Sequence, residues 1–327
     1  MRAVHRRRLA LSLSCFLALL NTGFAQESLL LQAAGKGAEA LLQSDRGKWP
    51  IHQLEAGDVW QLNLPLNKEF DASGLLLLTN GTLLTHSDRG PTLYTIELKA
   101  GTNSANLTPL SNLFAPSQLQ KYAREKYRYY DCEGVAQDAQ GRFYICEEAD
   151  RWILRCDPLT GDVQRLDIDW SPVKSFFSSD RNASFEGIAI GGNRLYVANE
   201  RSNPVIIVVD LPTLKITDHF QVFPRTPSFL GTHYSDLCWF ENKLWVLCRQ
   251  HRVILEVDPE NHRILSEYDY GNVEASLGYR TQLPVGIMEG LAVSRDVFWL
   301  VTDNNGMPRN SAPRDIRPSL LRLKRPQ

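Results

Sequence analysis

The chain has 327 residues, of which 43% are hydrophobic, and 36 basic side chains nearly balance 37 acidic ones. This length and this apolar content allow either two ordinary domains or one closed repeat architecture with a large core. Nucleic-acid binding normally requires a basic stripe, and no such cluster lies beyond the first residues, so we expect no nucleic-acid partner.

The N-terminus has the pattern of a signal peptide. Four arginines within residues 2–8 precede an apolar run, Leu9 to Leu20, that is too short to span a bilayer comfortably. Small residues at Gly23 and Ala25 predict cleavage after Ala25. Cleavage removes four of the 36 basic residues and none of the 37 acidic ones, leaving a formal charge near −5. We expect a periplasmic or secreted protein without a stable membrane anchor; an uncleaved anchor is the alternative.

Five variants of one repeat unit follow. Each unit opens with a polar or acidic residue that precedes a short apolar segment, and successive openings are 60, 53, 50 and 53 residues apart. A turn and a second strand rich in aromatic and branched residues come next, and a third strand often closes on Asp and a turn. The openings are Ser73-Gly74-Leu75, Glu133-Gly134-Val135, Glu186-Gly187-Ile188, Asp236-Leu237-Cys238 and Glu289-Gly290-Leu291.

Consecutive short strands with a period near 50 residues, and no helical periodicity between them, predict an all-β propeller of about five four-stranded blades. Residues 1–25 are then the signal peptide, residues 26–57 an N-terminal segment and residues 58–327 a single propeller domain. The strand Asp58 to Leu64 has no repeat unit of its own and could complete the last blade. The sequence leaves open the alternative of a sixth, degenerate blade within residues 27–70. We expect a monomer.

Blade geometry brings ten repeat positions to one mouth of the propeller. The innermost strand and the antiparallel second strand place the first residue of one beside the last residue of the other. We therefore expect pairs such as Glu133 with Glu148, at an offset of 15 residues. Eight of the ten positions are acidic and are our candidate metal ligands: Asp88, Glu133, Glu148, Glu186, Glu200, Asp236, Glu289 and Asp303. The other two are Ser73 and Arg249.

Carboxylates this crowded oppose one another's ionisation, so the ring requires compensation. A calcium ion is one solution, because calcium takes clustered oxygen ligands. Nearby arginines are a second; they are Arg89, Arg201, Arg249 and Arg252. As a third, purely structural solution, a carboxylate beside glycine could accept backbone amide protons and fasten one blade to the next.

Three segments resemble a known family. They are Asp131-Cys132-Glu133-Gly134, Phe185 to Ala189 with Val197 to Arg201, and Met288 to Ala292. They are similar to the SdiA-regulated domain family of bacterial envelope propellers and to the related family called esterase-like activity of phytase, over roughly residues 58 to 325. The resemblance implies a calcium-dependent propeller that could hydrolyse phosphoesters. Arg249 departs from the acidic or hydroxyl residue expected at its position.

If the protein is an enzyme, we expect metal-assisted hydrolysis of a small-molecule phosphoester. Calcium held by Glu133, Glu186 and Glu289 would orient a water, and Arg201 or Arg249 would contact the phosphate. The catalytic candidates are Glu186, Glu200, Arg201 and Arg249. The alternative is a propeller without catalytic activity that binds a protein, glycan or small ligand at the same mouth.

Other motifs of catalysis are absent from the sequence. It contains no serine-hydrolase elbow, zinc-protease helix or phosphate-binding glycine loop. His86 and His251 come nearest the ring by register, and His233 precedes the fourth opening; we expect hydrogen-bonding rather than base roles for the first two. Five cysteines remain after cleavage, and the sequence leaves open either one disulfide, Cys146 with Cys156 or Cys238 with Cys248, or buried thiols.

Overall fold

The computed structural model describes residues 49–63, 70–122, 130–280 and 285–326. The predicted signal peptide, its cleavage site and most of the N-terminal segment lie outside these residues. No helix in the described ranges is long and apolar enough to cross a membrane.

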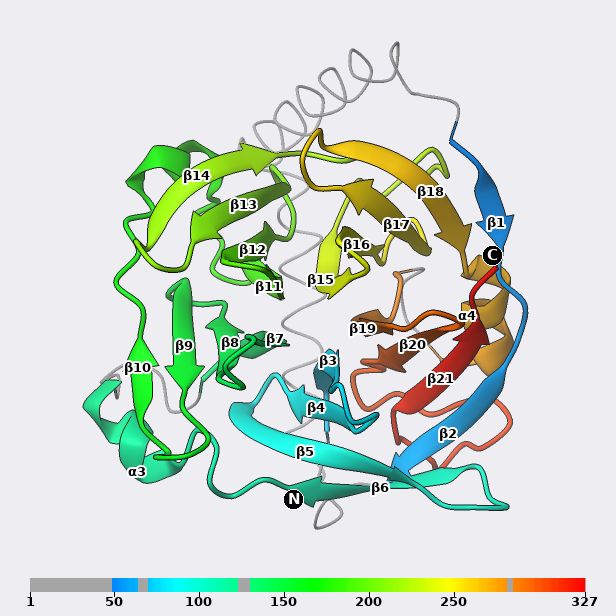
Figure 1. The fold of residues 1–327 in the computed structure, drawn as a ribbon. Helices are drawn as coiled ribbons and strands as arrows, with labels where there is room; N and C mark the ends of the chain where they lie inside the picture. The colour runs from blue at the N-terminus through cyan, green and yellow to red at the C-terminus, as the bar shows by residue number, and fades with distance from the viewer. Residues whose placement is uncertain (1–48, 64–69, 123–129, 281–284, 327) are drawn as a thin grey trace, which may run out of the picture. The chain divides into compact units, whose positions relative to one another are not determined.

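The described strands form units of four antiparallel strands, which we name blades in chain order (Figure 1). Blade 1 contains β3 (Ala72–Leu77), β4 (Leu83–Ser87), β5 (Gly90–Leu98) and β6 (Ser104–Pro109). Blade 2 contains β7 (Cys132–Gln137), β8 (Phe143–Glu147), β9 (Trp152–Cys156) and β10 (Val163–Arg165). Blade 3 contains β11 (Phe185–Gly191), β12 (Arg194–Asn199), β13 (Val205–Asp210) and β14 (Lys215–Phe220).

Blades 4 and 5 each include a strand from the N-terminal part of the chain. Blade 4 contains β15 (Tyr234–Phe240), β16 (Lys243–Cys248), β17 (Val253–Asp258) and β18 (Arg263–Asp269), and β1 (Ile51–Gln53) adds in parallel to β18. Blade 5 contains β19 (Met288–Val293), β20 (Val297–Thr302), β21 (Ser319–Lys324) and β2 (Asp58–Asn63). The β2–β21 pairing is the ring closure expected for the strand that begins at Asp58.

The innermost strands close a cycle. β3 contacts β7, β7 contacts β11, β11 contacts β15, β15 contacts β19, and β19 returns to β3. A parallel pairing of β2 with β6 also joins blade 5 to blade 1 at their outer strands. The fold is therefore the predicted all-β propeller. Short helices lie only in connections of the described chain: α3 (Pro116–Leu119), η2 (Gln120–Tyr122), η3 (Ser171–Phe176) and α4 (Gly271–Leu277).

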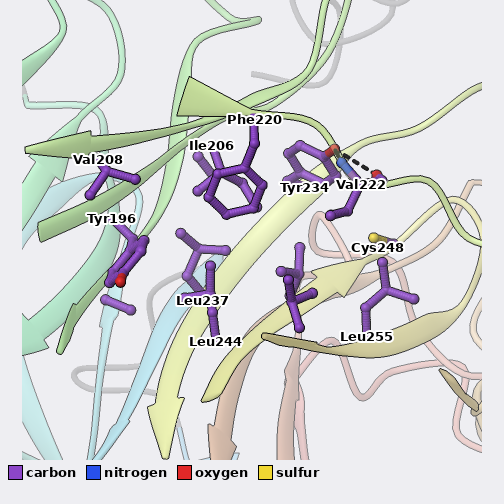
Figure 2. Packing of buried hydrophobic residues seen from close by; sticks show 14 of the residues in the cluster. Tyr196, Ile206, Val208, Phe220, Val222, Tyr234, Leu237, Leu244, Cys248 and Leu255 are labelled. Atoms are coloured by element: carbon purple, nitrogen blue, oxygen red, sulfur yellow. Dashed lines mark hydrogen bonds between the residues drawn. The ribbon is translucent and has the colours of Figure 1, made fainter. Parts of the chain in front are cut away.

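Apolar side chains fill the spaces between successive blades. Figure 2 shows the layer between blades 3 and 4, where Tyr196 and Val208 face Leu237 and Leu244. The aromatic position that repeats in the second strands is fully buried at Tyr144, Tyr196 and Trp245 and partly buried at Trp299. All five described cysteines are free thiols, so the disulfide alternative does not hold here.

Each inner strand begins with a β-bulge, and glycine follows the bulged residue in four blades. A Cβ atom on Gly134 would lie 2.5 Å from the backbone nitrogen of Ile188, and one on Gly187 would lie 2.5 Å from Cα of Asp236. Both distances are below any real carbon contact, so only glycine lets adjacent inner strands approach this closely. The Glu-Gly openings therefore encode the close packing of blades around the axis.

Candidate functional site

The mouth is the end of the ring where inner strands begin and second strands finish. The bulges change the register expected there. At this end of the blades, the outermost ladder pairs are Ala72–Ser87, Cys132–Glu147, Phe185–Asn199, Tyr234–Cys248 and Met288–Thr302. The predicted pairs, such as Glu133 with Glu148, are thus not ladder partners: the first acid lies in the bulge and the second follows the strand.

The register also corrects the alignment of blade 4. Matching the ladder pairs places Ser235 where blades 2, 3 and 5 have a glutamate, and it places Asp236 where they have glycine. The Asp236 carboxylate is fully buried. It accepts backbone N–H bonds from Leu237 at 2.8 Å, from Leu291 of blade 5 at 2.7 Å and from Leu75 of blade 1 at 3.4 Å. Asp236 therefore links blades 4, 5 and 1, because its two oxygens accept backbone hydrogen bonds from all three.

Two overlapping groups of carboxylates gather at the mouth. In each group, one ligand oxygen per residue lies within 4.8 Å of the others. The first group is Asp131, Glu133 and Glu148; the second is Glu148, Glu186 and Glu200. Glu133 also accepts a 2.5 Å hydrogen bond from the hydroxyl of Ser73 in blade 1. Side chains from separate repeats thus converge as the sequence predicted.

Burial and mutual repulsion raise the pKa values of this group. Burial, followed by the charges of Glu200 and Asp131, raises the pKa of Glu148 to about 8. The pKa values of Glu133 and Glu186 also lie well above the usual range, first because of burial and then because of neighbouring carboxylates. Without a cation, these groups are expected to retain protons near neutral pH.

Arg249 divides the acidic ring. Its guanidinium forms ion pairs with Glu200 of blade 3 and Glu289 of blade 5. Glu200 also pairs with Arg201 and accepts a 3.0 Å hydrogen bond from Nδ1 of His233. Burial alone would raise the pKa of Glu200, but Arg249, His233 and Arg201 outweigh it and lower the pKa to about 2. Glu200 and Glu289 are therefore compensated internally, which weakens their prediction as metal ligands.

The remaining predicted acids, Asp88 and Asp303, directly follow the second strands of blades 1 and 5. The pKa of Asp88 is raised to about 7 and that of Asp303 to about 6, in both cases first by burial. Arg89 donates a hydrogen bond to Asp71, and the charge of Asp71 contributes to the raised pKa of Asp88. Arg252 instead pairs with Glu274 of α4 at 2.7 Å, away from the ring carboxylates.

Sequence reasoning missed Asp131 and Asp71. Each lies just before its inner strand, three residues before glycine, and the equivalent positions elsewhere hold Ser184, His233 and Ile287. In blade 2 the backbone nitrogen of Glu148 donates to the carbonyl oxygen of Asp131 at 2.8 Å, which holds the two residues side by side. The sequence signal that could have identified Asp71 and Asp131 is their position three residues before the glycine of an inner strand.

His86 and His251 make hydrogen bonds, as expected for residues that do not act as bases. Nδ1 of His86 lies 3.2 Å from the carbonyl oxygen of Ser87, and burial lowers its pKa to about 4. The ring of His251 contacts the Thr226 carbonyl at 2.6 Å and the Thr232 hydroxyl at 3.0 Å.

The Asp131–Glu133–Glu148 group fits a hard divalent cation. Its donors are all oxygens, they are close together, and no arginine is paired with Glu133 or Glu148 among the described contacts. Burial, and after it the neighbouring carboxylates, raise the pKa values of Glu133 and Glu148. Buried carboxylates of this kind can hold a metal ion.

Comparison with known families decides the relationship. The family described as "Phytase-like: Esterase-like activity of phytase" matches residues 71–306, which is most of the chain. The chain belongs to this phytase-like family. Its match spans every inner strand of the propeller and all ten predicted ring positions. No curated protein matches the phytase-like chain.

Two solved structures were compared with this phytase-like propeller, and the first shares its fold. Glutaminyl cyclase from Myxococcus xanthus is 12% identical, with a TM-score of 0.55, and the match covers 84% of this chain and 97% of that one. Virginiamycin B lyase from Staphylococcus aureus is 13% identical, with a TM-score of 0.41, over 81% of this chain and 69% of that one. At 12% identity, the similarity to glutaminyl cyclase concerns the fold alone.

Proposed function

We propose that this chain is a periplasmic or secreted phytase-like propeller that binds calcium at its acidic mouth and hydrolyses small-molecule phosphoesters there. The observation that carries the proposal is the group of Asp131, Glu133 and Glu148, three carboxylates with ligand oxygens within 4.8 Å of one another. The signal-peptide pattern of residues 1–25 supports the location, and the family's description as esterase-like supports hydrolysis.

Asp131, Glu133 and Glu148 would hold the ion, and Glu186 lies beside Glu148 to take a bound water. Calcium bound there would polarise a phosphoryl oxygen. Arg201 is more available to a phosphate than Arg249, because its side chain is 24% exposed while Arg249 is held between Glu200 and Glu289. The chain's own acids would then orient water, and Arg201 would orient the ester.

A second candidate function is binding without hydrolysis. It is favoured by the pairing of both mouth arginines with Glu200, which leaves little free positive charge for a phosphate. In that case the calcium-loaded mouth would recognise a protein, a glycan or a small ligand. The two candidates share the calcium site and differ only in turnover.

Calorimetric titration of the EGTA-treated protein with calcium tests the shared site. We expect binding that Glu133→Gln removes, whereas the control Glu260→Gln, an exposed carboxylate at the β17–β18 turn, retains it. Release of p-nitrophenol from p-nitrophenyl phosphate, lost in EGTA and restored by calcium, would support the enzyme. Calcium binding without this hydrolysis would support the second candidate, and no binding would refute both.

A further inference from the structure

His233 occupies an unusual place at the mouth. It immediately precedes β15 of blade 4, at the position where blades 1 and 2 have Asp71 and Asp131. Its Nδ1 atom lies 3.0 Å from Oε1 of Glu200, and its side chain keeps 16% of its surface exposed. It is therefore a histidine oriented by a buried carboxylate, beside the carboxylates described above.

The backbone holds this pair in place. The nitrogen of Tyr234 donates to the carbonyl oxygen of Glu200 at 3.2 Å, which ties the residue after His233 to the residue that orients it. The Tyr234 ring is fully buried, and its hydroxyl bonds to both the nitrogen and the carbonyl oxygen of Val222, as Figure 2 shows. The start of β15 is thus anchored on both sides of the strand.

The charge of Glu200 determines which nitrogen of His233 carries hydrogen. Glu200 is fully buried, and Arg249 and Arg201 pair with its two oxygens, so it is an ionised acceptor. A carboxylate can only accept, so Nδ1 of His233 must donate to it. Nε2 makes no hydrogen bond within the described part of the chain, so this nitrogen is available to a ligand.

We propose that His233 is the general acid of the phosphoester hydrolysis proposed above, on which this inference rests, and that Glu200 is its positioning residue. The P–O bond to the leaving oxygen breaks while a water oxygen forms the new P–O bond. The leaving oxygen takes the proton of His233 Nε2, and the proton released by the water restores the imidazolium. The products are an alcohol and phosphate.

This role is distinct from that of the calcium ligands. Glu200 takes part in no cation site that we assign, because Arg249, Arg201 and His233 use its oxygens. Glu148 links the two functions, since it belongs both to the group that contains Glu133 and to the group that contains Glu200. A phosphoester bound beside Glu148 would therefore have the cation on one side and His233 on the other.

The dependence on the leaving group tests the proposal. Phenyl phosphate requires protonation of its leaving oxygen, whereas p-nitrophenyl phosphate, with a more acidic phenol, requires it far less. We expect His233→Gln to lower kcat with phenyl phosphate about 100-fold, the lower range for general acid catalysis, and with p-nitrophenyl phosphate less than about 10-fold. Equal losses with both esters would overturn the role of His233 while leaving the proposed hydrolysis intact.

Two controls separate this result from damage to the fold. His262→Gln changes another histidine paired with a carboxylate, Asp218 at 2.9 Å, but at the β17–β18 turn, and should leave both activities unchanged. Calcium binding by His233→Gln should match that of the unchanged protein. Nitrogen NMR of the unchanged protein should show hydrogen on Nδ1 of neutral His233; hydrogen on Nε2 would overturn the proposal. A protein that binds calcium but hydrolyses neither ester would refute the proposed function and, with it, this role.

Discussion

Replacing Arg249 by Met should destabilise the propeller strongly. The side chain is 16% exposed and joins Glu200 of blade 3 to Glu289 of blade 5. Removing it leaves Glu200 with Arg201 and His233, but leaves Glu289, which is 8% exposed, without its ion-pair partner. Loss of one member of a buried pair costs about 3–5 kcal/mol because the remaining charge is uncompensated.

A change of this size is readily measured by thermal unfolding in EGTA. For a domain of more than 200 residues, each kcal/mol shifts Tm by roughly 2 °C, so Arg249→Met should lower Tm by about 6–10 °C. The double variant Arg249→Met/Glu289→Gln should recover part of the loss, because it removes the stranded charge. Arg201→Met is the matched control and should lower Tm less, since Arg249 and His233 remain on Glu200.

Calcium adds a second expectation for the same variant. Arg249→Met makes the ring more acidic, so the ion should raise the Tm of this variant by more than it raises the Tm of the unchanged protein. A fall in Tm of less than about 2 °C for Arg249→Met, or purely additive effects in the double variant, would refute the reasoning that Arg249 compensates the ring.

The remaining predictions concern packing and pH. Gly187→Ala should cost about 3 kcal/mol in urea unfolding, because its Cβ would lie 2.5 Å from Cα of Asp236, whereas Gly90→Ala, with no atom within 4 Å, should be nearly neutral; equal effects would contradict the packing account. Without calcium, stability should fall as pH rises from about 5 to 8, because Glu148, with a pKa raised to about 8, holds more protons in the folded than in the unfolded state. Calcium replaces those protons, so its effect on Tm should be larger at pH 8 than at pH 5; an effect independent of pH would contradict the assignment of Glu148.

The arrangement of strands was largely predictable from the sequence. The third strand predicted for each unit is present in every blade, and the Glu-Gly openings begin inner strands in blades 2, 3 and 5. These signals are local: a turn, an alternation of apolar residues and a glycine that permits close approach. The convergence of carboxylates followed from them, because repeated hairpins bring equivalent residues to one end.

The register at the mouth was not predictable to a single residue. A bulge adds one residue without changing the apolar pattern, so Glu133 and Glu148 are offset by one step from the ladder. Blade 4 has no glycine, and its segment Tyr234-Ser235-Asp236-Leu237 can be aligned by its acid or by its apolar residues. The structure follows the alignment by apolar residues, because Leu237 must face the core. Asp236 is then buried and accepts hydrogen bonds from the backbone of three blades.

The partners of charged side chains were the least predictable feature. Arg249 was expected at the ring, but its length allows it to reach any of several carboxylates, and only the folded geometry selects Glu200 and Glu289. The same geometry gives Glu200 and Glu148 different surroundings, although both directly follow equivalent second strands. One has a pKa lowered to about 2 and the other a pKa raised to about 8.

The position of the bound ion is the most direct test of the calcium site. Crystals of the protein grown with calcium should show one anomalous scattering peak bounded by Asp131, Glu133 and Glu148, with carboxylate oxygens at roughly 2.3–2.6 Å. These carboxylates without an ion between them, in crystals saturated with calcium, or an ion bound only on another face of the propeller, would contradict the account.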